Sequence, residues 1–117
     1  MSHHFLLEAP MIPEAQALYD EDLKDSGYVW NVSRLWAYQP DTMNDLFDLM
    51  GEAFTHSGLD FRQRGILVTT AASTLGDSYC SLAWGGKLAA KTDGALAAGV
   101  LSGDDTALTT QERTIAA

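Results

Sequence analysis

The chain contains one cysteine, Cys80, in 117 residues. A single thiol can form neither an intramolecular disulfide nor a cysteine-based zinc cluster, so cross-links of those two kinds cannot hold the fold together. With 46% hydrophobic residues, the chain is long enough for one compact domain with a real apolar core and too short to argue for two. We therefore expect a single domain over residues 1–117.

The charge of the chain bears on its partners. The formal charge is −9, from 16 acidic and 7 basic side chains, and it repels phosphate backbones and anionic lipid surfaces. We therefore expect neither a nucleic-acid partner nor a membrane partner. The first residues lack a basic signal region and no run of eighteen apolar residues occurs, which predicts a cytoplasmic protein. Residues 61–91 form the net-positive stretch of the chain, and they contain Cys80.

Helix start and stop signals recur along the first half. Pro13 and Glu14 open a helix that closes at residues 26–27, and a short helix is expected over residues 33–38. Pro40 opens a longer helix that ends at Gly58. Its apolar residues follow the spacing of a single helical stripe, which we interpret as core: Met43, Leu46, Phe47, Met50 and Phe54.

The second half carries equally local signals. Asp60 and Gln63 resemble a capping pair for a helix that reaches residue 74, and its length and the absence of a partner strand favour a helix over a strand. Asp77 or Ser78 caps the next helix, which runs to about residue 90 and places Cys80 in its first turn. A short helix from residues 92–94, a turn at 103–105 and a capping box at 109–112 complete an all-α prediction. The chain finishes two turns into its last helix, so we expect a truncated chain or a helix completed by another subunit.

Two segments carry a family resemblance. GLDFRQR at residues 58–64, then a small-residue apolar helix, a glycine break and SYCSLAWG at residues 78–85, resemble the central signature of the carboxymuconolactone decarboxylase and alkylhydroperoxidase D-like family. The upstream helix is similar as well, and the resemblance covers residues 35–117. It implies an all-α, alkylhydroperoxidase D-like helical bundle that forms homo-oligomers.

The resemblance implies less about activity than about fold. In its peroxidase branch, the family uses a CxxC dithiol, a nearby histidine and a glutamate proton relay, and a partner protein reduces the resulting disulfide. Only the second cysteine position is matched here, by Cys80. Asp77 occupies the first cysteine position, Trp84 the histidine position and Gly65 the glutamate position.

Cys80 has two interpretations. Backbone N–H groups and the positive end of the helix dipole favour a reactive thiolate in a first turn. Asp77 opposes ionisation, and free cysteine is often an inert core residue. If Cys80 is reactive, the chain is a peroxidase-related thiol oxidoreductase with one cysteine, and an external thiol must reduce it.

His56 is the one non-terminal histidine and the candidate imidazole base. His3 and His4 suit a free end or a tag remnant, so we expect no metal site. We expect no cofactor either.

Other functions stay open at this point. A lactone decarboxylase-like lyase could hold a substrate carboxylate on Arg62 or Arg64, although both also suit a helix surface. A non-catalytic oligomeric binding module on the same scaffold is the third hypothesis.

The remaining residues around Cys80 also have two interpretations each. Asp77 is a helix cap or an acid–base group, and Trp84 is core packing or the wall of a pocket. Lys87 and Lys91 add positive potential further along the helix. Glycines 85 and 86 inside a helix predict a close backbone crossing, which we expect at a subunit interface.

Overall fold

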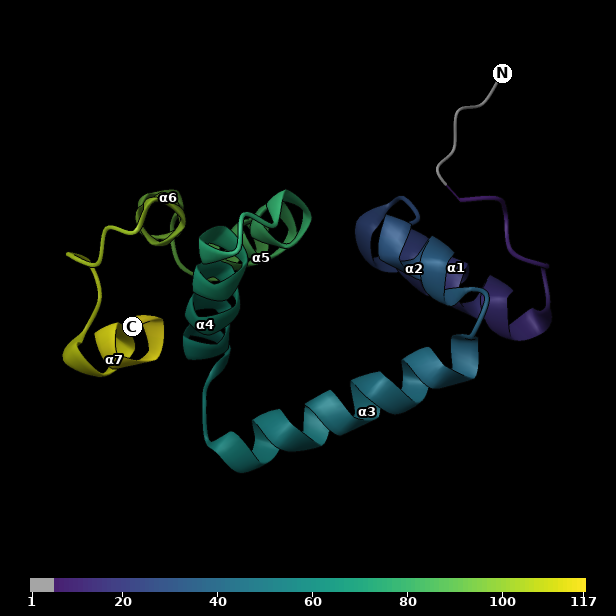
Figure 1. The fold of residues 1–117 in the computed structure, drawn as a ribbon, viewed down its shortest axis with the longest axis horizontal. Helices are drawn as coiled ribbons and strands as arrows, with labels where there is room; N and C mark the ends of the chain where they lie inside the picture. Colours follow the sequence, from purple (N-terminus) through teal and green to yellow (C-terminus); the bar gives the residue numbers. More distant parts are fainter. Residues whose placement is uncertain (1–5) are drawn as a thin grey trace, which may run out of the picture. The chain divides into compact units, whose positions relative to one another are not determined.

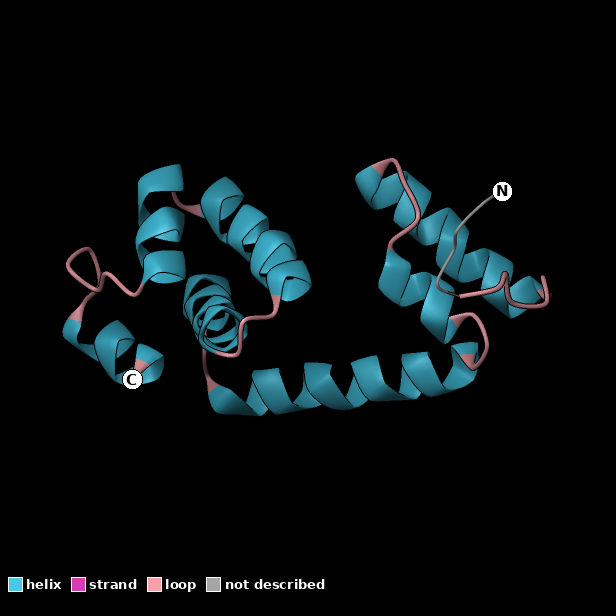
Figure 2. Cartoon of the chain, turned by 45° about the horizontal axis from the view of Figure 1, so that its top comes forward, coloured by secondary structure: helices cyan, strands magenta, loops and turns pink. Residues whose placement is uncertain are grey.

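The computed structural model describes residues 6–117, so His3 and His4 lie outside the described residues. Over that range the chain is all-helical, with seven helices and no strand (Figures 1 and 2). The helices are α1 (Pro13–Ser26), α2 (Asn31–Trp36), α3 (Pro40–Ser57), α4 (Phe61–Thr74), α5 (Ser78–Lys91), α6 (Gly94–Ser102) and α7 (Thr110–Ala116). The all-α prediction is confirmed, including the choice of helix over strand for residues 61–74.

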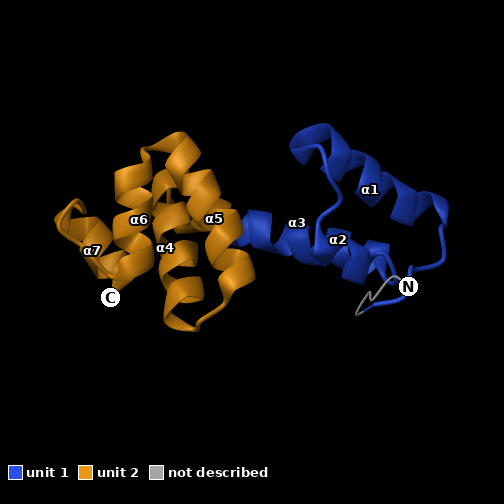
Figure 3. Cartoon of the chain, turned by 90° about the horizontal axis from the view of Figure 1, so that it is seen from above, with its two compact units in different colours: residues 1–53 blue, residues 54–117 orange. Residues whose placement is uncertain are grey.

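The chain divides into two compact units, Met1–Ala53 and Phe54–Ala117 (Figure 3). The boundary falls inside α3, so the last turn of that helix belongs to the second unit. Each unit has its own cluster of buried apolar side chains. The single domain over residues 1–117 stays a prediction.

The first unit is built on α1 and α2. Pro13 starts α1 without needing a hydrogen-bonded N–H, and Gly27 ends it in the left-handed region at φ +78°. The core contains residues from α1, from the segment before it and from the end of α2: Ala9, Ala15, Leu18, Tyr19 and Ala37. An ion pair between Arg34 and Glu8 (2.7 Å) links α2 to the segment that precedes α1.

The second helix begins two residues earlier than predicted, at Asn31 rather than at residue 33. The backbone N–H of Trp30 donates to the carboxylate of Asp22 (2.9 Å), which lies on α1. The start of α2 is therefore fixed by a contact with another helix. No local capping side chain precedes it, which is why the sequence pattern misplaced its bounds.

The prediction that the apolar stripe of α3 is core is wrong for the described chain. Leu46 is 38% exposed and Phe47 50% exposed, while Met43, Met50 and Phe54 are only half-buried. Of the stripe, Met43 packs against the core of the first unit. Amphipathic spacing predicted the apolar face correctly, but burial requires a second element over that face, and α1 and α2 reach only the beginning of α3.

The second unit is arranged around α4, which packs against α5, α6 and α7, while α5 also packs against α6 (Figure 1). Its core contains one side chain from α4, one from α5, three from α6 and one from the turn before α7: Ile66, Leu88, Leu96, Ala97, Val100 and Leu108. Ile66 and Leu88 are fully buried. These contacts hold α4 and α5, which carry the candidate site residues, in a fixed register.

Side-chain caps begin four helices of the second unit: those of α4, α5 and α7 were predicted, whereas for α6 the sequence predicted only a helix start at residues 92–94. Asp60 and Gln63 form a reciprocal capping box at α4, and Thr109 and Glu112 form another at α7. Asp77 caps α5, and Asp93 caps α6. Each cap satisfies backbone N–H groups that would otherwise lack an intrahelical partner.

Gly85 makes a close crossing, but within the chain. A Cβ added at Gly85 would lie 3.1 Å from Cδ1 of Leu101, on α6. A Cβ at Gly86 would meet nothing within 4 Å. The contact between α5 and α6 therefore accounts for Gly85, and the expected crossing at a subunit interface is not needed to explain it.

Candidate functional site

The start of α5 presents Cys80 as predicted. Gly76, which follows the end of α4, has a backbone φ of +71° in the left-handed region. The next residue, Asp77, is extended and caps α5. The carboxylate of Asp77 accepts the backbone N–H of Cys80 (3.0 Å). Cys80 is thus the third residue of α5, in its first turn, and its side chain is half-buried.

Burial and Asp77 together set the ionisation of the Cys80 thiol. Burial, a hydrogen bond between the thiol and Asp77, and the negative charge of that carboxylate together raise the pKa of Cys80 above its usual range. The same hydrogen bonds, from the backbone N–H first and from the thiol second, lower the pKa of Asp77. At neutral pH the resting pair is therefore a protonated thiol beside an ionised carboxylate.

Further residues share a stripe of α5 with Cys80. Trp84, Lys87 and Lys91 follow it at spacings of four, seven and eleven residues, which place them on the same side of a helix. Trp84 is half-buried, and both lysines are exposed. The Cys80 thiol therefore lies at one end of a stripe of side chains that continues with the aromatic ring of Trp84 and then with two lysines.

Neighbouring helices extend this stripe into a surface that we name the cation–aromatic face. The guanidinium of Arg64 lies 3.9 Å from the ring centroid of Phe54 and 5.0 Å from that of Trp84. Nζ of Lys87 lies 4.9 Å from the Trp84 centroid, and Nζ of Lys91 lies 5.9 Å from that of Phe61. The rings of Phe61 and Trp84 stack at 6.3 Å. The face consists of Phe54, Phe61, Arg64, Trp84, Lys87 and Lys91, all within the second unit.

The cations of this face are held by rings rather than by carboxylates. Arg64, Lys87 and Lys91 form no ion pair with the carboxylates of residues 6–117. Nε of Arg64 is also buried without a hydrogen-bond partner in the described chain, which is costly for a charged donor. Three positive charges thus remain unneutralised on one face of a strongly acidic chain.

Arg62 has a structural partner, unlike Arg64. Its guanidinium donates to both carboxylate oxygens of Glu112, at 2.6 and 3.2 Å, and joins α4 to α7. Glu112 is buried, and the hydrogen bonds from Arg62 lower its pKa to about 2. The sequence showed Glu112 only as a capping residue, because a pair fifty positions apart leaves no local pattern. Of the two arginines proposed as carboxylate anchors, Arg64 alone lacks a carboxylate partner among the described residues.

Gly65 stands where the resemblance expects a glutamate, and the structure shows what surrounds it. A Cβ at this position would lie 3.1 Å from Cδ1 of Leu88, which is fully buried. Glycine here permits the close approach of α4 and α5.

The other predicted site residue, His56, lies in the last turn of α3 and is exposed. The effects that raise the pKa of Cys80 come from burial and from Asp77, and none comes from His56. Within the described residues, no group of three or more His, Cys, Asp and Glu side chains is arranged to hold a metal ion.

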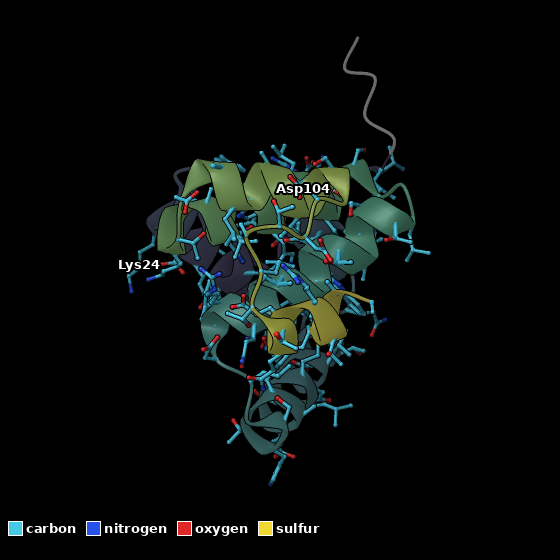
Figure 4. The ribbon with its side chains drawn as sticks, turned by 90° about the vertical axis from the view of Figure 1, so that its left-hand side faces the viewer. Lys24 and Asp104 are labelled. Atoms are coloured by element: carbon cyan, nitrogen blue, oxygen red, sulfur yellow. The ribbon has the colours of Figure 1, made fainter. Side chains whose placement is uncertain are left out.

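The second unit also contains a small cavity. It has a volume of about 180 Å³ and is lined by α4, α6, α7 and the turn between the last two, with Thr70, Asp104 and Arg113 among its polar residues. The hydroxyl of Thr70 has no partner in the described chain. Asp104, labelled in Figure 4, lies in the turn. Its carboxylate accepts the backbone N–H of Thr106 (2.9 Å). Cys80 does not line this cavity, so it is separate from the candidate site.

Comparisons with models of protein families, with curated proteins and with solved structures found no match to this chain. Over residues 6–117, no helix combines the length and the apolar character needed to cross a membrane.

Proposed function

We propose that the chain is a peroxidase-related thiol oxidoreductase of the carboxymuconolactone decarboxylase-like family that acts through Cys80 alone. The observation that supports this is the position of the thiol. Cys80 is partly accessible in the first turn of α5 and in contact with the Asp77 carboxylate, rather than sealed in the middle of a helix. The alkylhydroperoxidase D-like arrangement of the helices and self-association belong to the same proposal.

The proposed reaction needs only one cysteine. The Cys80 thiolate attacks the nearer oxygen of a hydroperoxide, the O–O bond breaks, and an alcohol and a sulfenic acid form after protonation. An external thiol then condenses with the sulfenic acid, which releases water and leaves a mixed disulfide. A second external thiol attacks that disulfide, restores the Cys80 thiol and leaves with the first as a disulfide.

The raised pKa sets the conditions for this chemistry. Because the thiolate is the nucleophile, only a minor fraction of Cys80 is reactive at pH 7. We therefore expect slow turnover that accelerates as the pH rises. Asp77 restrains the thiol in this scheme, since its low pKa makes it a weak proton acceptor.

A sulfenic-acid trap tests the proposal. The protein is treated with hydrogen peroxide or an alkyl hydroperoxide at pH 7 and at pH 9, with a dimedone-type probe present, and the adduct is located by mass spectrometry. We expect labelling of Cys80 that is greater at pH 9 and is lost in Cys80→Ser. Absence of labelling at both values, although a neutral alkylating reagent modifies the same thiol, would exclude the proposal.

A non-catalytic oligomeric binding module is the second candidate, and the surface around Cys80 favours it. Leu75 is 83% exposed and Leu82 77% exposed, and they flank the start of α5. Both residues are close to Cys80 in the sequence, and contiguous exposed apolar surface is typical of surfaces that bind another protein. Self-association that Leu82→Lys abolishes, with no peroxide consumption, would support this candidate, whereas peroxide consumption that depends on Cys80 would eliminate it.

A lactone decarboxylase-like lyase is favoured by one observation, the unpaired guanidinium of Arg64. In this hypothesis Arg64, and not Arg62, holds the substrate carboxylate. Carbon dioxide release from a muconolactone that Arg64→Lys reduces would support it. Equal release by the wild type and by this variant would remove Arg64 from the site.

A further inference from the structure

The cation–aromatic face concentrates positive charge on a chain that is acidic as a whole. The chain has 7 basic residues against 16 acidic ones, and three of the seven lie on this face without a carboxylate partner in the described chain. Arg64 and Lys87 approach the same ring, that of Trp84, at 5.0 and 4.9 Å. Two cations that share one ring repel each other, and a bound anion would stabilise both.

Cys80 lies on the same side of α5 as the residues that this helix contributes to the cation–aromatic face. At a rise of about 1.5 Å per residue, Lys87 lies about 10 Å along the helix from Cys80, and Lys91 lies about 16 Å from it. Trp84 lies between Cys80 and the lysines on the same stripe. A molecule that places an anionic group near Lys87 and extends along Trp84 therefore reaches the first turn of α5 with its other end.

We propose that the external thiol that reduces oxidised Cys80 is a small anionic thiol, with its carboxylate on the cation–aromatic face and its sulfur at Cys80. This inference rests on the proposed function, because it names the reductant of the same site. The thiol condenses with the Cys80 sulfenic acid and water leaves, and a second molecule of it attacks the mixed disulfide and restores the Cys80 thiol.

The charge distribution favours a small thiol over an acidic protein. An acidic protein would bring its charges close to the acidic surface of a chain whose net charge is −9. A small molecule senses mainly the charges within a Debye length, about 8 Å at physiological ionic strength. Near Lys87 those charges include the guanidinium of Arg64, which approaches the same Trp84 ring. Asp77 acts against the anion at the sulfur end, so the carboxylate must lie several bonds away from the thiol.

Charged and neutral disulfide reagents test the face directly. The Cys80 thiolate attacks either dianionic dithiobis(nitrobenzoate) or neutral dithiodipyridine, forms a mixed disulfide and releases a coloured thiolate or thione. The measured quantity is the ratio of the two rate constants at low salt. We expect Lys87→Glu to lower this ratio about fivefold or more, Lys87→Gln to lower it less, and 1 M salt to remove the difference.

Lys24 provides the matched control. It is an exposed lysine in the last turn of α1 (Figure 4), which belongs to the first unit and not to the cation–aromatic face, so Lys24→Glu makes the same change in net charge without altering that face. Both rate constants are measured on the same thiol of the same variant. A change in the pKa or the accessibility of Cys80 therefore affects both and cancels in their ratio. A ratio that Lys87→Glu leaves unchanged, or that Lys24→Glu lowers equally, would overturn the proposal.

The reductant itself is tested on the mixed disulfide of Cys80 with thiopyridine. Reduction by anionic mercaptopropionate and by neutral mercaptoethanol is compared between the wild type and Lys87→Glu. We expect the variant to lose rate selectively with mercaptopropionate. Neither assay uses peroxide, so a missing sulfenic acid contradicts the proposed function alone, while unselective reduction contradicts the anionic reductant alone.

Discussion

The carboxylate of Asp77 accepts the backbone N–H of Cys80 at 3.0 Å and so begins the helix that carries the single thiol of the chain. The same carboxylate raises the pKa of that thiol. One side chain therefore stabilises the helix start and suppresses the nucleophile. Under the proposed family relationship, this is the first cysteine position of the dithiol, and the aspartate found there supplies no thiol and restrains the ionisation of Cys80.

Asp77→Asn should separate these two effects. Asparagine is also a good N-cap, so we expect the helix to remain, whereas the loss of negative charge lowers the pKa of Cys80. The rate of alkylation by iodoacetamide at pH 7 should rise about threefold or more, since each pKa unit changes the thiolate fraction about tenfold. Circular dichroism controls for the helix content. A slower reaction in the variant would show that Asp77 assists the thiol.

The pH dependence of the wild type follows from the same pKa. Because the pKa of Cys80 lies above its usual range, the thiolate fraction increases about tenfold per unit between pH 7 and pH 9. We expect the alkylation rate to follow this increase without a plateau at pH 8, as measured by mass spectrometry of quenched samples. A plateau below pH 8 would contradict the raised pKa.

Glu112→Gln should lower stability in a pH-dependent manner. The pKa of Glu112 in the folded chain is about 2, below its ordinary value of 4.5, so its charge contributes stability above pH 4.5 that is lost as the pH falls towards 2. The shift corresponds to up to about 3 kcal/mol. Glutamine keeps a cap acceptor, so we expect a loss of about 2 kcal/mol at pH 7 and a much smaller loss at pH 2.5 in urea unfolding followed by circular dichroism.

Asp105→Asn is the control for that measurement. Asp105 and Arg113 form an exposed ion pair at 3.8 Å, which should contribute less than about 1 kcal/mol. Equal losses in the two variants would mean that the Arg62–Glu112 pair has no special role.

The two adjacent glycines of α5 should respond differently to alanine. Gly86→Ala meets open space and should stabilise the helix by about 0.5 to 1 kcal/mol. Gly85→Ala brings its Cβ to 3.1 Å from Leu101, so strain offsets the gain in helix propensity. We expect Gly85→Ala to melt below Gly86→Ala in thermal unfolding. Equal melting temperatures would show that Leu101 moves aside without cost.

The sequence predicted the features that depend on contacts between residues close together in the chain. The caps at Asp60, Asp77 and Thr109 are side chains that bond to backbone groups three residues away, so spacing alone reveals them. The placement of Cys80 in a first turn followed from such a cap. The start of α2 was misplaced because it depends on Asp22, eight residues earlier and on another helix.

The sequence pattern could not predict contacts between helices. The Arg62–Glu112 pair and the ring contacts of Arg64 join residues whose separation along the chain carries no periodic signal. A net-positive stretch around residues 61–91 was visible, but not that its cations lie on aromatic rings. Burial of the α3 stripe failed as a prediction because spacing describes one helix, whereas burial needs two.

The close approach at Gly65 bears on how this chain could change. A glutamate at position 65, which the proposed family relationship expects, would bring its Cβ to 3.1 Å from the fully buried Leu88, so the added group would strain the contact between α4 and α5 that has to position it. A smaller residue at position 88 would relieve that strain. Engineering a proton relay into this chain therefore calls for a coupled substitution at positions 65 and 88 rather than a change at position 65 alone.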